Sequence, residues 1–130
     1  MNENITIGIT GAGGALGKSL TKKFKLEGYK IVGFSHNKLS KSKDEIGPDE
    51  WVIWECGKEF LLEKKLKKID ILVLNHGVYK SEINNSYYEN SIEINALSKL
   101  RLMSIFEKIA LNENNDNKKE IWINTSEAEI

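Results

Sequence analysis

The chain has 130 residues, and its 19 basic and 19 acidic side chains cancel to a formal charge of zero. This length is enough for one domain with a core and too short for two. The lysines are spread along the chain rather than gathered in one tract, so no nucleic-acid partner is expected.

No apolar stretch is long enough to cross a membrane, and the polar N-terminus lacks the basic-then-apolar order of a signal peptide. Cys56 is the only cysteine, which excludes an internal disulfide and a thiolate metal cluster, and no metal site is expected. The sequence therefore predicts a cytoplasmic domain without a membrane partner.

An apolar run at residues 5–10 predicts a buried strand, which breaks on glycines and restarts as a helix over residues 15–26. Further strands are predicted at residues 31–34, 51–54, 71–74 and 121–124, and further helices at residues 59–68 and 91–111. The buried helix faces are expected to be Leu16, Leu20 and Phe24, then Leu62, Leu66 and Ile69, then Ala96, Leu100 and Met103.

Strands that alternate with helices, and that are apolar along their length, are typical of a parallel sheet covered on both faces. Right-handed crossovers then favour a doubly wound α/β fold with strand order 3-2-1-4-5, in a single domain over residues 1–130. A ligand of such a sheet lies at the carboxyl ends of strands 1 and 4, where the winding reverses.

The glycine-rich turn after the first strand is the feature on which this interpretation depends. It contains Gly11, Gly13, Gly14, Ala15, Leu16 and Gly17. Because glycine has no Cβ, a phosphate can approach the N–H groups at the positive end of the following helix. The turn therefore predicts nucleotide binding, and a glycine-rich loop without a ligand is the alternative.

Four motifs in chain order resemble the short-chain dehydrogenase/reductase family along nearly the whole chain. They are Thr10-Gly-Ala-Gly-Gly-Ala-Leu-Gly17, Asp70-Ile-Leu-Val-Leu-Asn-His-Gly77, Glu93-Ile-Asn-Ala-Leu-Ser98 and Ile121-Trp-Ile-Asn-Thr-Ser126. Ala15, Leu74 and His76 depart from the family pattern. The resemblance implies a Rossmann-type fold and an oxidoreductase that moves hydride between a nicotinamide dinucleotide and a small carbonyl or alcohol substrate.

The resemblance also implies a cofactor site. The backbone of residues 11–17 would hold the pyrophosphate, and Glu55 falls where the family has an adenine-binding aspartate, with Cys56 assigned to the same site. Asn75, His76 and Gly77 would line the path from the ribose to the nicotinamide.

The end of strand 2 bears on the choice between NADP and NAD. NAD enzymes carry an acidic residue there, which binds the ribose 2′-OH. In this chain the position is Ser35, followed by His36, Asn37 and Lys38. The missing carboxylate favours NADP over NAD, and a plain turn after the strand is the alternative.

The catalytic residues that the resemblance implies are incomplete. Ser126 is assigned as the catalytic serine, with Glu127 next to it, and Asn95 as the helix asparagine. None of the four tyrosines has a lysine four residues later, so the family's Tyr-x-x-x-Lys pair would lie beyond Ile130. We therefore expect a cofactor-binding portion, truncated after strand 5, that binds dinucleotide without turnover and associates through its strand-5 edge.

Other interpretations stay open. Residues 12–19 fit a loose P-loop, in which Lys18 would reach the phosphates and Ser19 the magnesium of a nucleoside triphosphate. The spacing Thr10-Gly-x-x-Gly14-x-x-Gly17 also fits the turn of sugar-nucleotide epimerases. The chain could instead be a non-catalytic dinucleotide-binding module. His76 is either a proton shuttle or, more commonly, a hydrogen-bonded side chain of the site wall.

Overall fold

The computed structural model describes residues 4–36, 46–76, 96–112 and 118–123. Its strands are β1 (Thr6–Thr10), β2 (Lys30–Ser35), β3 (Glu50–Ile53), β4 (Ile71–Leu74) and β5 (Glu120–Ile123). Its helices are α1 (Ala15–Leu26), the 3-10 helix η1 (Glu59–Leu62), α2 (Glu63–Leu66) and α4 (Ser98–Asn112). Each strand lies within one residue of its predicted position at either end, because these short apolar runs are bounded by polar residues. Among the helices of the described ranges, none is long and apolar enough to span a membrane.

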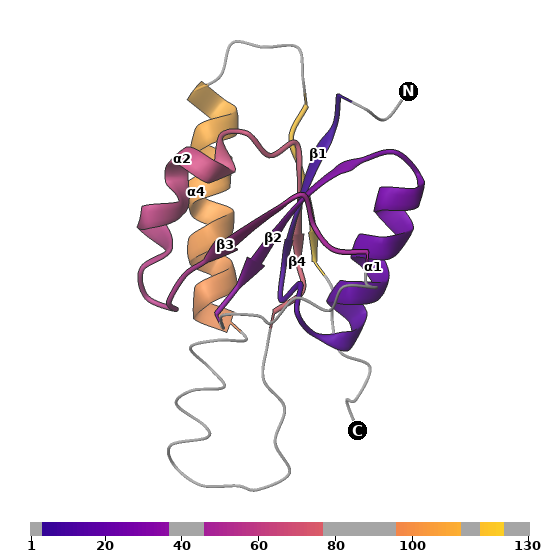
Figure 1. Cartoon of the computed structure of the whole chain (residues 1–130). Coiled ribbons are helices and arrows are strands. Elements are labelled where there is room, and N and C mark those ends of the chain that lie inside the picture. The colour runs from indigo at the N-terminus through magenta and orange to yellow at the C-terminus, as the bar shows by residue number, and fades with distance from the viewer. Residues whose placement is uncertain (1–3, 37–45, 77–95, 113–117, 124–130) are drawn as a thin grey trace, which may run out of the picture.

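The five strands form one parallel sheet in the order β3-β2-β1-β4-β5, which confirms the predicted doubly wound, Rossmann-like α/β fold. Figure 1 shows α1 against one face of the sheet and α2 with α4 against the other. Residues on successive positions of a strand point to opposite faces, so strands covered on both sides must be apolar throughout. The winding reverses between β1 and β4, which are hydrogen-bonded neighbours.

Two apolar clusters hold these layers together. The cluster on the α4 side contains Val32, Phe34, Trp54, Leu62, Leu66, Ile69, Leu72, Leu74, Leu102, Phe106 and Ile109. The cluster on the α1 side contains Ile7, Ile9, Ala12, Ile31 and Val73, with Leu20 and Phe24 of α1 packed against it. Both clusters draw on β1, β2 or β4, so the central strands are buried from both faces.

The buried face of α4 differs from the prediction. Ala96 and Leu100 are exposed and Met103 is only half-buried, whereas Ser98, Leu102, Phe106 and Ile109 face the sheet. The predicted stripe was out of phase because Ser98, which is polar and small, occupies the innermost position of the first turn. A residue of that kind adds nothing to an apolar pattern.

The inner face of α1 also differs in one position. Leu20 and Phe24 pack as expected, but Leu16 is 47% exposed, and the fully buried residues of this helix are Gly17 and Thr21. The first turn of α1 lies so close to the β1–α1 turn that no large side chain fits between them.

The side chains of the edge strand β5 differ in exposure. Ile121 is half-buried and packs against the α4-side cluster, whereas Trp122 and Ile123 are exposed. Trp122 lies near Phe24 of α1, with ring centroids 6.0 Å apart. Association through this edge stays a prediction.

The layered packing predicts a contrast between two leucines of neighbouring turns. Leu66 is fully buried, and Leu61 is 66% exposed. Leu66→Ala should lower the free energy of unfolding by about 2–5 kcal/mol, since it leaves a cavity between α2 and the sheet. Leu61→Ala should change it by about 0.5 kcal/mol or less. Urea unfolding followed by circular dichroism measures both, and similar losses in the two variants would contradict this packing.

Candidate functional site

The turn between β1 and α1 is held by close backbone approaches that exclude side chains. Gly11 has a φ of +65°, and a Cβ there would lie 2.9 Å from the Cα of His76 and 3.0 Å from the carbonyl oxygen of Asn75. A Cβ on Gly17 would lie 2.2 Å from the carbonyl oxygen of Gly11. Both positions therefore require glycine, and the turn is pressed against the chain that leaves β4.

Within the described part of the chain, the start of α1 has backbone donors and no side-chain cap hydrogen bond. Gly14 is the N-cap residue, and its own N–H donates to the carbonyl of Gly11 at 3.1 Å. The first intrahelical bond runs from the N–H of Lys18 to the carbonyl of Gly14 at 2.9 Å. No acidic side chain stands in the first turn, and Gly14, Ala15 and Leu16 are exposed. The positive end of the helix dipole and the first-turn N–H groups are thus open to an anion.

Thr10, at the end of β1, joins the two central strands through its hydroxyl. Its Oγ1 accepts the backbone N–H of Asn75 at 2.9 Å and that of His76 at 3.2 Å. The same oxygen lies 2.8 Å from Nδ1 of His76 and 3.3 Å from the carbonyl of Val73. This buried hydroxyl fixes where the chain goes after β4, and so fixes the floor beneath the glycine turn.

Both ring nitrogens of His76 have a polar partner. Nδ1 lies 2.8 Å from the Thr10 hydroxyl, which itself donates to the carbonyl of Val73 at 3.3 Å. Nε2 lies 3.1 Å from Oγ of the buried Ser98. Burial lowers the pKa of His76 to about 3, and the charges of His36 and Lys99 act in the same direction. A neutral ring whose two nitrogens both have hydrogen-bond partners is suited to lining the site. This favours the structural interpretation of His76 over the proton shuttle.

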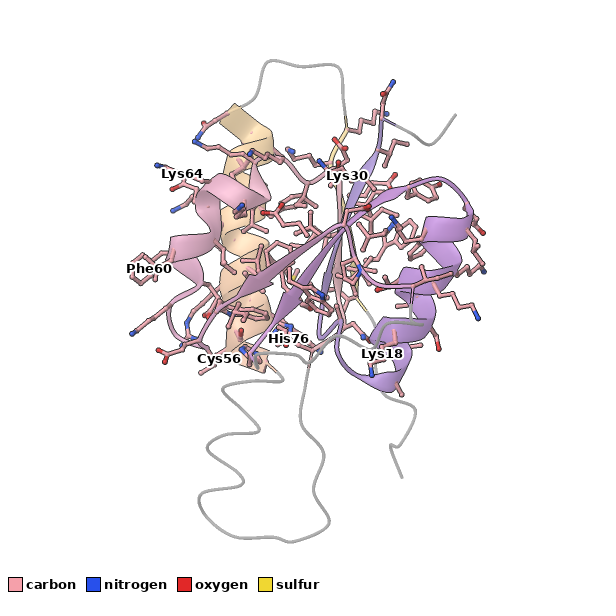
Figure 2. All side chains as sticks on the ribbon, in the orientation of Figure 1. Lys18, Lys30, Cys56, Phe60, Lys64 and His76 are labelled. Carbon is pink, nitrogen blue, oxygen red and sulfur yellow. The ribbon has the colours of Figure 1, made fainter. Side chains whose placement is uncertain are left out.

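The ends of β2 and β3 bring together side chains that are far apart in sequence. The ring of His36 lies against that of Trp54, with centroids 3.9 Å apart, and its Nε2 is 3.2 Å from Sγ of Cys56. The ring of His76 completes the group, 5.7 Å from His36 and 5.4 Å from Trp54 between centroids. Figure 2 shows Cys56, His76 and Lys18 at the same end of the sheet, opposite Lys30 at the start of β2.

The buried carboxyl group of Glu59 fixes Trp54 of this cluster. Glu59 of η1 is 1% exposed, and its Oε2 accepts the indole N–H of Trp54 at 3.2 Å and the backbone N–H of Gly57 at 2.8 Å. Its Oε1 pairs with Arg101 of α4 at 3.1 Å. Each oxygen of the buried charge has a donor, so the network stabilises the loop after β3 against α4.

The predicted cofactor residues are only partly brought together. Asn75 and His76 border the glycine turn, and Ser35 is buried at the end of β2. Glu55 is exposed and pairs with Lys58 at 3.1 Å. Gly77, Asn95 and Ser126 lie outside the described residues, so the catalytic assignments of Asn95 and Ser126 stay predictions, as does the cofactor assignment of Gly77.

Several residues that hold the site together through hydrogen bonds were not predicted from the sequence. They are Thr10, Trp54, Glu59, Ser98 and Arg101. The His36–Cys56 contact was missed as well, although strand pairing could have indicated it. Because β2 and β3 pair in parallel with Ser35 opposite Ile53, the residues that follow the two strands must come close together.

Two alternatives can be weighed against this geometry. Within the described ranges, no group of three or more His, Cys, Asp or Glu side chains is placed to hold a metal ion. A P-loop needs an aspartate at the end of a neighbouring strand to hold magnesium. The neighbours of β1 are β2 and β4, which end at Ser35 and Leu74, and neither end supplies a carboxylate.

Comparison with known proteins identifies the family. Residues 7–127 match the family model described as "NAD dependent epimerase/dehydratase family". The chain belongs to this family. It is also similar to a monoglucosyldiacylglycerol epimerase of Synechocystis sp., with 32% identity over 130 residues that cover 95% of this chain and 31% of that protein. The chain thus spans about a third of the length of this curated relative of the family.

Solved structures share the fold. MoeE5 in complex with UDP-glucose and NAD matches with a TM-score of 0.74 and 16% identity, over 95% of this chain and 37% of that one. Serine dehydrogenase from Escherichia coli matches with a TM-score of 0.75 and 21% identity, over 92% and 60% of the two chains. A short-chain dehydrogenase from Leptospira borgpetersenii with bound NAD+ matches with a TM-score of 0.72 and 17% identity, over 93% and 51%. Identities this low establish a shared fold alone.

These findings support the broader part of the resemblance. Short-chain dehydrogenases are among the structural neighbours, but the narrower assignment to their family stays a prediction. The family match instead agrees with the alternative based on Gly14 and Gly17, the turn spacing of the epimerase type. Asn75-His76-Gly77, which had favoured the short-chain type, is too short a motif to decide between two branches of one fold.

The buried, neutral state of His76 predicts a loss of stability in mild acid. In an unfolded chain a histidine has a pKa of about 6.5, so the unfolded state takes up the proton first as the pH falls. The stability contributed by neutral His76 is complete above about pH 6.5 and is lost as the pH falls from there toward 3. Between pH 7.5 and 5, the free energy of unfolding should fall by about 2 kcal/mol more for the native chain than for His76→Gln.

Titratable groups other than His76 are present in both the native chain and His76→Gln, so their effects cancel in the difference between the two free energies of unfolding. Equal slopes of unfolding free energy against pH would show that His76 is not buried as a neutral ring. Nitrogen NMR gives an independent reading, since the chain has only two histidines. His76 should stay neutral without titrating between pH 8 and 5.

Proposed function

We propose that this chain is the dinucleotide-binding part of an enzyme that moves hydride between a nicotinamide cofactor and an alcohol or carbonyl carbon. The observation that carries the proposal is the turn at the β1–β4 switch point, where Gly11 and Gly17 leave no room for side chains and the N-terminus of α1 is open. Membership of the NAD dependent epimerase/dehydratase family supports the same cofactor class.

The fit to a dinucleotide rests on backbone chemistry. The pyrophosphate would lie at the N-terminus of α1, where N–H groups and the helix dipole stabilise negative charge. A Cβ on Gly14 would meet only the carbonyl oxygen of Gly11, at 3.5 Å, so the space beside the first turn is otherwise clear. In doubly wound sheets the adenosine half lies over the strands on one side of the switch point and the nicotinamide half over the other. His36 and Cys56 would then border the adenosine half.

The residues of this chain would bind and orient the cofactor, which supplies the hydride-accepting ring when bound. Thr10 and His76 hold the floor of the site in one position through neutral hydrogen bonds. Because the His76 ring is neutral and both of its nitrogens have hydrogen-bond partners, we expect it to shape the site rather than to transfer a proton. His76 is therefore not proposed as the acid–base group of the reaction.

The proposed substrate class is the chemical group that the named activities of two similar proteins have in common. The relative from Synechocystis is named as an epimerase of a glucosylated lipid, and serine dehydrogenase as a dehydrogenase. Removal of hydride from an alcohol carbon is a first step that epimerases of this cofactor class and dehydrogenases have in common. An alcohol carbon, such as that of a sugar hydroxyl, is the substrate group that both names support.

Blocking the clear space at the start of α1 should weaken dinucleotide binding strongly without unfolding the chain. In Gly14→Val the backbone can stay in its extended conformation, with a φ of −77° and a ψ of 173°, and the new side chain enters the space proposed for the pyrophosphate. The dissociation constant for NADPH, measured by isothermal titration calorimetry, should rise about tenfold or more, which is at least about 1.4 kcal/mol.

Gly47→Val is the matched control for this experiment. A Cβ on Gly47 meets nothing within 4 Å. The residue precedes the amino end of β3, whereas the turn follows the carboxyl end of β1 in the same parallel sheet. This variant should bind NADPH as tightly as the native chain. Native affinity in a folded Gly14→Val protein would sink the assignment of the turn as the pyrophosphate site.

We further propose a preference for NADP over NAD. The residue at the end of β2 is Ser35 rather than an acidic residue, so no carboxylate at that position would repel a 2′-phosphate. NADPH should therefore bind more tightly than NADH, by about threefold to tenfold, because a phosphate makes stronger charge-assisted hydrogen bonds than a hydroxyl. Competition titration at a fixed salt concentration measures the ratio, and tighter binding of NADH would overturn this preference.

A further inference from the structure

The helical segment of residues 58–68, which contains η1 and α2, has a buried face and an exposed face. Its buried face belongs to the α4-side cluster through Leu62 and Leu66. Phe60 and Leu61 lie on the other side, and each is 66% exposed. Two adjacent large apolar side chains on one exposed turn form a small apolar patch, which the packing of the fold does not use.

Three exposed lysines lie on the same side of this segment as the apolar pair. Lys64, Lys67 and Lys68 follow Phe60 and Leu61 at spacings of three, four and seven residues, which place side chains on one face of a helix. In the described part of the chain none of the three lysines forms an ion pair. Figure 2 shows Phe60 and Lys64 pointing away from the sheet. These five side chains make up the outer face of the segment.

The remaining charges of the segment do not cancel these three lysines. Lys58 and Lys65 are each paired with a glutamate outside the segment. Of the two glutamates within it, Glu59 is buried and Glu63 is exposed. The outer face therefore carries more positive than negative charge, and its chemistry matches an anionic partner that also accepts apolar side chains.

An anionic lipid surface offers both features at once. The apolar side chains of an amphipathic segment enter the boundary between headgroups and acyl chains, and lysines beside them are attracted to anionic headgroups. Lysine suits this position because its apolar stem can lie along the boundary while the ammonium group stays in water. A nucleic acid would match the lysines but would leave Leu61 without an apolar environment. Since the formal charge of the whole chain is zero, a general attraction to polyanions is not expected either.

We propose that the outer face of residues 58–68 docks this chain on an anionic membrane surface. Phe60 and Leu61 enter the headgroup region, and the three unpaired lysines lie among the lipid phosphates. The sequence predicted no membrane partner because no apolar stretch is long enough to cross a bilayer, but a contact of this kind lies on the surface and needs no spanning segment. The docking also needs no dinucleotide, so it is independent of the proposed function.

Sedimentation with lipid vesicles tests the proposal on the chain without a cofactor. The chain should bind vesicles of equal parts phosphatidylglycerol and phosphatidylcholine about tenfold or more tightly than vesicles of phosphatidylcholine alone, because lysines are attracted to a negative surface potential. Added salt should weaken this binding, since it screens the attraction. Absence of binding to the anionic vesicles, or equal binding to both kinds, would overturn the proposal.

A pair of lysine variants assigns the attraction to the outer face. Lys64→Gln combined with Lys67→Gln should raise the apparent dissociation constant for the anionic vesicles about tenfold or more, since each lysine near the surface contributes separately. Lys22→Gln combined with Lys23→Gln is the matched control, because it removes the same charge from exposed positions of α1, on the other face of the sheet. The control should change the constant by about twofold or less, because salt screens charges that lie far from the lipid.

A pair of apolar variants tests the insertion of the exposed turn. Phe60→Ser combined with Leu61→Ser should weaken vesicle binding about tenfold or more while the lysines stay in place. Leu26→Ser combined with Leu111→Ser is the control, because both leucines are exposed at the ends of α1 and α4. All substituted residues are exposed, so each variant should fold, which circular dichroism checks. Native binding by either outer-face variant, equal losses in a variant and its control, or tighter binding of single-stranded DNA than of anionic vesicles would contradict the proposed docking.

Discussion

The close approach between Gly11 and the chain leaving β4 is the constraint on which the rest of this site depends. The two backbones meet so closely that a Cβ on Gly11 would lie within about 3 Å of three backbone atoms of Asn75 and His76. The Thr10 hydroxyl holds them there by accepting both backbone N–H groups. The start of α1 and the position of the His76 ring both depend on this contact. The site is thus defined mainly by backbone geometry, and the Thr10 hydroxyl is the side-chain group that stabilises it.

The buried polar groups next to the site are also held by hydrogen bonds. His76, Glu59 and Ser98 are all buried at the carboxyl edge of the sheet, and each has hydrogen-bond partners in the described part of the chain. Arg101, the indole N–H of Trp54 and a backbone N–H surround the carboxyl group of Glu59. Burial disfavours the charged form of His76 and lowers its pKa to about 3, and the charges of His36 and Lys99 act in the same direction. Both side chains contact Trp54, because Glu59 accepts its indole N–H and the His76 ring lies 5.4 Å from it between centroids.

The sequence predicted the parts of the structure that depend on local pattern. Every strand is a short apolar run bounded by polar residues, and strand order follows from alternation with helices, so the fold could be predicted from residues such as Ile7, Ile31 and Leu72. Side-chain placement could be predicted less well, as the α4 face shows. Ser98 is innermost because His76 needs a partner there, which is a contact between residues 22 positions apart that no helical period contains. The His36–Cys56 pair depends in the same way on the register of β2 and β3 rather than on either sequence segment alone.

The same distinction explains why the branch of the family was harder to predict than the fold. The proposed role of the turn depends on backbone N–H groups and the absence of side chains, so it places few demands on other residues, and structural neighbours at 16–21% identity share the fold. A motif made of glycines consequently predicts a cofactor class and leaves the reaction open. What separates one enzyme from another must lie in side chains at the strand ends, where Ser35, His36 and Cys56 stand.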